Sequence, residues 1–132
     1  VAFLSHSTFG QPVTDRTKRI SDAVEILKKS NVDFKFDGEM QPDVALEEVY
    51  KELYPFSEIV GSSNVLIMPS QHSAAISYKM IKSMSRAKVI GPLLIGLGLP
   101  IEIAPLRSST SEIINLASIA AYSADVIDYK KN

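Results

Sequence analysis

The sequence predicts an α/β fold: a mostly parallel sheet flanked by helices in three layers. Short apolar runs typical of strands alternate along the chain with longer segments whose apolar residues recur at helical spacing. This alternation favours parallel strands that are joined by helical crossovers on both faces of the sheet. The length of 132 residues suits one domain that is large enough to bury a core.

The first half of the chain is expected to form a strand, a helix, a second strand and a second helix. The expected strands are residues 1–5 and 32–36, and the first helix is residues 15–30. In that helix the apolar residues recur at i, i+3, i+4 and i+7 from Ile20. The pair Asp37-Gly38 predicts a turn after the second strand. The second helix begins near Pro42, which suits a first turn, and ends before Pro55.

The second half is expected to add three short strands and two helices. Residues 65–68, 88–90 and 101–104 are the expected strands, and residues 73–85 are the expected helix between the first two. The run Ser109-Thr110-Ser111-Glu112 matches a capping box, so it predicts the start of a last helix that continues to about Asp128.

Composition excludes several classes of function. Fourteen Lys and Arg residues against fifteen Asp and Glu residues give a net charge of −1, which offers no electrostatic footprint for nucleic acid or anionic lipid. The absence of cysteine excludes disulfide frameworks, thiol catalysis and cysteine-zinc sites, and it fits a reducing compartment. The most apolar stretch, 89–106, carries three prolines and Glu102. It is therefore expected to be a buried strand-and-turn region rather than a membrane span.

The first residues set two further expectations. Residues 1–4 lack the basic segment of a signal peptide, so a cytoplasmic location is expected. The chain has no initiator methionine and opens on a strand-like run, so we expect it to be a piece of a longer polypeptide.

Ligands of parallel α/β sheets bind beyond the carboxyl ends of the strands. The loops expected there are rich in Ser, Thr, Gly and Gln, whose hydroxyls and backbone amides suit phosphate or carboxylate groups. They are residues 5–10, 37–41, 69–73, 91–92 and 105–109. His6 follows a serine, but no nucleophile-elbow motif is present, so hydroxyls that contact a ligand are expected here rather than a catalytic Ser/His pair. His6, His72, Asp37 and Glu39 have no recognised metal-ligand spacing, so no metal site is expected.

Seven segments, taken together and in order, resemble the phosphate acetyl/butyryltransferase family. The resemblance is closer to the arm of that family that is fused to the C-terminus of bacterial NADP-dependent malic enzymes. The segments are STFG at 7–10, DGEMQPD at 37–43, YPFS at 54–57, NVLIMP at 64–69, HSA at 72–74, IGPLLIGL at 90–97 and IINLA at 113–117.

The resemblance implies that residues 1–132 are the second subdomain and closing helix of a phosphotransacetylase-like domain, with an upstream malic enzyme portion absent. NADP and Mg or Mn would belong to that absent portion, and the fragment itself would hold no cofactor. The implied function is a regulatory and oligomerisation module of a homo-oligomer, with acetyl-CoA or a related acyl-CoA as effector. The alternatives are an active phosphate acetyl/butyryltransferase and a purely structural oligomerisation module.

The transferase motif of the family is degenerate in this chain. Active members carry Asp-Leu-Ser-Arg-Gly and, a few residues later, an Asp that assists the thiol of coenzyme A. The Asp, Ser and Arg of that motif correspond here to Ile103, Pro105 and Leu106, and the later Asp corresponds to Glu112. Leucine supplies no guanidinium for a charged phosphoryl group, and proline supplies neither a hydroxyl nor a backbone donor. The resemblance therefore implies a fragment without catalytic residues. For Glu112, a role as helix cap remains the alternative to a former catalytic position.

The resemblance also implies a set of ligand-binding residues, whose hydroxyls and cations would contact phosphate or pantetheine groups. Ordinary loop or capping roles remain open for each of them. The set is Ser7, Thr8, Ser73, Tyr78, Lys79, Arg107, Ser108 and Ser109.

Overall fold

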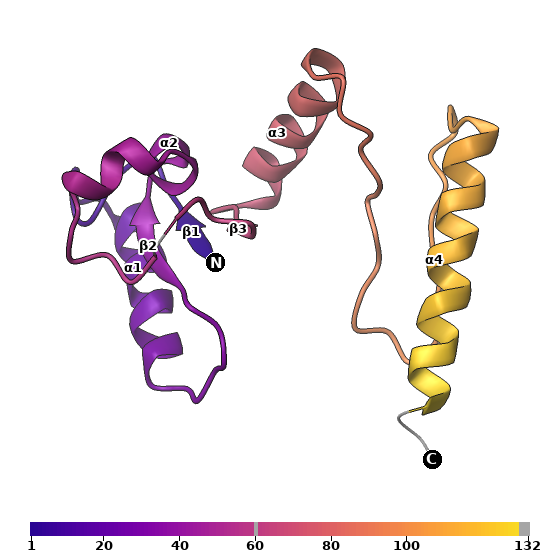
Figure 1. Cartoon of the computed structure of the whole chain (residues 1–132), viewed down its shortest axis with the longest axis horizontal. Helices are drawn as coiled ribbons and strands as arrows, with labels where there is room; N and C mark the ends of the chain where they lie inside the picture. The colour runs from indigo at the N-terminus through magenta and orange to yellow at the C-terminus, as the bar shows by residue number, and fades with distance from the viewer. Residues whose placement is uncertain (60, 130–132) are drawn as a thin grey trace. The chain divides into compact units, whose positions relative to one another are not determined.

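The computed structural model describes residues 1–59 and 61–129, coloured along the chain in Figure 1. The chain divides into two compact units, Val1–Met80 and Ile81–Asn132, of which the second is described as far as residue 129.

The first unit is built on a three-stranded parallel sheet. Its strands are β1 (Ala2–Leu4), β2 (Asp37–Met40) and β3 (Leu66–Ile67), in the order β2-β1-β3. Both pairings of the central strand are parallel, and Ala2 is in register with Asp37 on one side and Leu66 on the other. With the helices described next, this sheet confirms the predicted α/β class.

Helices follow the strands as expected, but their bounds differ from the predicted ones. They are α1 (Asp15–Lys28), α2 (Pro42–Leu46), the 3₁₀ helix η1 (Glu48–Glu52), α3 (Gln71–Met84) and α4 (Thr110–Tyr129). Thr14 caps α1: its hydroxyl accepts a hydrogen bond from the Thr17 amide, and its own amide donates to the Thr17 hydroxyl. Helix α1 packs on β2 and β1, and α2 packs on β1.

The core of the first unit lies between β1, β2 and α2. Ala2 and Leu4, two residues apart on β1, point to the same face of the sheet. They pack with Met40 and Ala45, and all four are at most 3% exposed. Phe9, Val44, Ile59 and Met68 complete this cluster from its margin. The core is thus in contact, through Phe9, with the loop that follows β1.

The predicted second strand at 32–36 is wrong, because pairing with β1 begins only at Asp37. Asp37-Gly38 is not a turn but the start of β2. A Cβ on Gly38 would lie 2.7 Å from the Phe3 carbonyl oxygen, so only glycine permits this approach of the strands. The Asp37 carboxylate accepts hydrogen bonds from the Ser57 hydroxyl and the Glu58 amide, which holds the strand in place.

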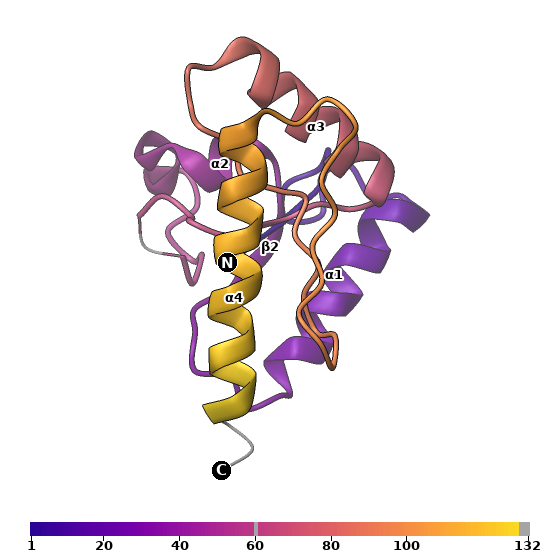
Figure 2. The ribbon, with the colours of Figure 1, turned by 90° about the vertical axis from the view of Figure 1, so that its right-hand side faces the viewer.

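Two further expectations differ from the structure. Helix α2 ends at Leu46, because Glu47 adopts an extended conformation before η1 begins. The strands expected at 88–90 and 101–104 are not formed: the segment that joins α3 to α4 contains neither helix nor strand (Figures 1 and 2). That segment is also not buried as expected, since Ile95 and Leu99 are 87% and 69% exposed.

Candidate functional site

A cavity of about 290 Å³ lies within the second unit. Its walls come from the last turn of α3, the segment that follows it, and the first turns of α4. Ile90, Pro105 and Leu116 contribute apolar surface. The polar side chains that line it are Lys82, Lys88, Ser108, Ser109, Ser111, Glu112 and Asn115. A cavity with two ammonium groups and several hydroxyls at a helix N-terminus suits an anionic ligand.

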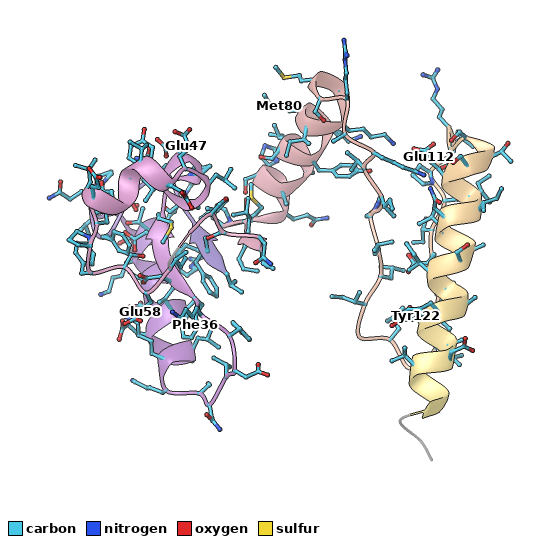
Figure 3. All side chains as sticks on the ribbon, viewed as in Figure 1. Phe36, Glu47, Glu58, Met80, Glu112 and Tyr122 are labelled. Atoms are coloured by element: carbon cyan, nitrogen blue, oxygen red, sulfur yellow. The ribbon has the colours of Figure 1, made fainter. Side chains whose placement is uncertain are left out.

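Ser109 and Glu112 form the capping box that the sequence predicts at the start of α4. The Ser109 amide and hydroxyl donate to Oε2 of Glu112 at 2.8 Å and 3.0 Å. The Glu112 amide donates in return to the Ser109 hydroxyl at 3.3 Å. Figure 3 shows Glu112 at the N-terminal end of α4. Two amides of this helix start therefore have partners that the chain itself supplies.

The other oxygen of Glu112 pairs with a lysine from α3. The Lys82 ammonium donates to Oε1 at 2.8 Å. The hydrogen bond from Lys82, followed by those from the Ser109 amide and hydroxyl, lowers the pKa of Glu112 from 4.5 to about 2. A carboxylate with so low a pKa stays ionised at neutral pH and is a weak general base.

The cavity brings together only part of the predicted site in this region of the chain. Ser108, Ser109, Pro105 and Glu112 line it. The side chains of Ile103 and Leu106 are 59% and 104% exposed and are not among the residues that line it. Arg107 is also exposed and does not line the cavity.

Sequence reasoning missed four polar residues of this cavity: Lys82, Lys88, Ser111 and Asn115. The predicted helix start could have indicated Ser111 and Asn115. They lie four residues apart at the beginning of that helix and therefore share one face of it. The Asn115 Nδ2 atom is buried and has no hydrogen-bond acceptor among the described residues.

Ser7 and Thr8, the predicted ligand residues of the first unit, face inward. Ser7 is fully buried, and its hydroxyl donates to Oε1 of Glu39 at 2.9 Å. The Gly10 amide donates to the same oxygen at 2.7 Å. The Thr8 hydroxyl accepts from the Gln41 amide at 3.1 Å. These hydroxyls thus hold the loop after β1 onto β2, and their ligand role stays a prediction.

The remaining predicted residues lie on α3. Ser73 belongs to its first turn, where its hydroxyl donates to the Ser70 carbonyl at 2.9 Å and its amide donates to the Ser70 hydroxyl at 3.2 Å. Tyr78 is half-buried and Lys79 is exposed. Neither lines the cavity of the second unit. The ligand roles of these three residues also stay predictions.

Within 1–59 and 61–129, no three His, Asp or Glu side chains lie close enough together to hold a metal ion. None of the helices described in these ranges is both long and apolar enough to cross a membrane.

The parallel sheet of the first unit and its helices define an α/β protein. Residues 1–121 match the family described as phosphate acetyl/butaryl transferase, so the chain belongs to this family. This confirms the resemblance that the seven segments carry.

The relatives include both malic enzymes and transferases. The chain is 49% identical to an NADP-dependent malic enzyme of Rhizobium meliloti, over 94% of this chain and 16% of that protein. It is 36% identical to a phosphate acetyltransferase of Clostridium acetobutylicum, over 94% of this chain and 38% of that protein. The solved phosphotransacetylase of Streptococcus pyogenes has a TM-score of 0.84 and 34% identity, over 93% of this chain and 38% of that one. The chain spans only a small part of each relative.

Proposed function

We propose that this chain is a regulatory and oligomerisation module of an NADP-dependent malic enzyme, and that it senses acetyl-CoA or a related acyl-CoA. Malic enzyme relatives at 49% and 41% identity support the proposal that the longer protein is a malic enzyme. The two lysines and the serine hydroxyls of the cavity support a ligand that carries phosphate groups.

The hydrogen bonds and the low pKa of Glu112 are the observation that carries the proposal of a module that binds a ligand but does not catalyse a reaction. By resemblance, this position corresponds to the Asp that assists the thiol of coenzyme A in active transferases. Here the carboxylate is held by Lys82 and Ser109, and its pKa is lowered to about 2. Pro105, on the cavity wall, offers no hydroxyl. These groups bind and orient a ligand but supply neither a base nor a phosphoryl-binding guanidinium.

In this proposal, residues 1–132 are the second subdomain and closing helix of a phosphotransacetylase-like domain in a homo-oligomeric, cytoplasmic protein. The conversion of malate to pyruvate and carbon dioxide, with NADP and Mg or Mn, belongs to a portion outside this chain. Large apolar side chains exposed in the second unit, such as Ile95 and Leu99, support contacts with other parts of the protein or with further copies.

The test is malate-dependent reduction of NADP by the full-length protein, with and without saturating acetyl-CoA. We expect acetyl-CoA to change the rate by about fivefold or more, which corresponds to a typical coupling free energy between two sites. An unchanged rate would reject the regulatory proposal and leave the purely structural module.

The relatives at 36% identity named phosphate acetyltransferase favour an active transferase as the second candidate. The discriminating assay is formation of acetyl phosphate from acetyl-CoA and inorganic phosphate by the same full-length protein. Because Ile103, Pro105 and Leu106 replace the reactive motif, we expect no turnover. Measurable acetyl phosphate would establish the transferase instead.

A further inference from the structure

A groove of about 340 Å³ lies in the first unit, lined by α1, the loop after β1, β2 and the loop after η1. Its carboxylates are Glu25 of α1, Asp37 and Glu39 of β2, and Glu58 of the loop after η1. Among the described residues that line it, Lys28 is the one cation. Four carboxylates against one ammonium give the groove a negative potential, which attracts a positively charged ligand.

Two of these charged groups already have partners within the chain. The Lys28 ammonium donates to Oε1 of Glu25 at 2.9 Å. This hydrogen bond raises the pKa of Lys28, and the charges of Asp37 and Glu58 add to the rise. The Asp37 carboxylate accepts from the amide of the next residue and, on its other oxygen, from a hydroxyl and an amide of the loop after η1. Lys28 and Asp37 are therefore satisfied by the protein itself.

Glu39 is different, because only one of its oxygens has donors. The residue is 2% exposed, and Oε1 accepts from the Ser7 hydroxyl and the Gly10 amide. Within residues 1–59 and 61–129, no donor lies at Oε2. This oxygen is not sealed in the interior either, since the buried side-chain atoms without a partner in these ranges are Ser63 Oγ and Asn115 Nδ2. Glu39 thus presents a free acceptor to the groove, and a cationic N–H group would satisfy it.

Two aromatic rings line the same groove. The rings of Phe9 and Phe56 meet edge to face with their centroids 4.9 Å apart, and Phe56 is 65% exposed. Aromatic faces attract ammonium groups and offer apolar surface to an alkyl chain. A metal ion fits less well, because no three His, Asp or Glu side chains of the described residues lie close enough together to hold one. A buried carboxylate beside aromatic rings is instead the chemistry that recognises an alkylammonium group.

We propose that this groove binds an aliphatic diamine. One ammonium group donates to Oε2 of Glu39, the alkyl chain lies against Phe9 and Phe56, and the second ammonium is attracted by Glu58 at the exposed rim. The excess of carboxylates over lysine accommodates both charges of such a ligand. The site goes beyond the proposed function and does not depend on it, because all the residues of the acyl-CoA cavity belong to the second unit.

The experiment is calorimetric titration of putrescine, a straight-chain diamine, into the full-length protein and its variants. We expect saturable binding by the wild type and about tenfold weaker binding by Glu39→Gln, which removes the charge from the hydrogen bond to the ligand. Phe56→Ala should weaken binding about threefold through loss of the ring. The matched control is Phe34→Ala, since Phe34 is also an exposed aromatic residue of the first unit but does not line the groove.

A further variant covers the case in which Glu39→Gln fails to fold. Glu58 is exposed, so Glu58→Gln should fold and weaken putrescine binding about twofold, whereas Glu52→Gln, an exposed carboxylate outside the groove, should leave it unchanged. Absence of saturable binding by the wild type would overturn the inference. Equal affinities of the wild type, Phe56→Ala and Glu58→Gln would also overturn it, as would equally tight binding of butanol, which has no ammonium group. None of these results bears on the malate assay, in which an unchanged rate with acetyl-CoA rejects the proposed function.

Discussion

Lys82 and Glu112, thirty residues apart in the sequence, form an ion pair of 2.8 Å that ties the last turn of α3 to the first turn of α4. The pair closes one corner of the cavity and keeps the glutamate ionised. It is also the contact on which the proposed lack of catalysis depends.

This ion pair predicts how stability depends on pH. The pKa of Glu112 is lowered from 4.5 to about 2 by the folded structure, so the fold favours the ionised form. Its contribution is fully present above pH 4.5 and is lost as the pH falls towards 2. The melting temperature of the wild type should exceed that of Glu112→Gln by a constant margin near neutral pH. That margin should shrink between pH 4.5 and pH 2.

Thermal unfolding of both proteins across this range checks the prediction. Lys82→Gln serves as the companion variant, because it removes the hydrogen bond that lowers the pKa of Glu112 the most. It should reduce the same pH-dependent margin. A margin that stays constant down to pH 2 would show that the ion pair does not form in solution.

Position 38 in β2 is predicted to tolerate no side chain larger than that of glycine. Its φ is +152°, and a Cβ would meet the Phe3 carbonyl oxygen at 2.7 Å and the Phe3 Cβ at 2.8 Å. Gly38→Ala should therefore lower the free energy of unfolding by about 2 kcal/mol. Urea unfolding measures this change. Gly98→Ala is the control, because nothing lies within 4 Å of a Cβ there, and its effect should stay within about 0.5 kcal/mol.

Glu39 is predicted to hold the loop after β1 in place. It is 2% exposed, and its Oε1 accepts hydrogen bonds from the Ser7 hydroxyl and the Gly10 amide. Glu39→Ala leaves both donors without this acceptor and should cost about 2 kcal/mol or more in urea unfolding. Glu39→Gln keeps a carbonyl oxygen as acceptor and should cost about 1 kcal/mol. Losses near zero for both variants would mean that the carboxylate oxygens do not support the loop.

The fold class was predictable because it depends on periodic patterns. Alternating strands and helices indicated a parallel sheet, and the capping box at Ser109 located the start of α4 to within one residue. The position of β2 was not predictable in this way. Residues 32–36 have the alternation of a strand, but pairing with β1 begins at Asp37, beside the close approach of Gly38 to Phe3. That contact joins residues far apart in the sequence and leaves no periodic signal.

The cavity residues were predictable only where a local sequence motif, the helix start after Ser109, indicates them. Ser108 and Ser109 were expected to bind a ligand, and both line the cavity, whereas the hydroxyls of Ser7 and Thr8 serve the loop around Glu39. Spacing alone does not tell a hydroxyl that faces a ligand from one that faces a buried carboxylate. Lys82 carried no signal either, because its partner lies on another helix.

The most direct test of the central claim is calorimetric titration of acetyl-CoA into the full-length protein and two serine variants on α4. Ser111 lines the cavity, whereas the exposed Ser118 does not, so Ser111→Trp fills the cavity and Ser118→Trp is its matched control. We predict that the wild type and Ser118→Trp bind acetyl-CoA and that Ser111→Trp does not. Absence of binding by the wild type, or unchanged binding by Ser111→Trp, would contradict the assignment of this cavity as the acyl-CoA site.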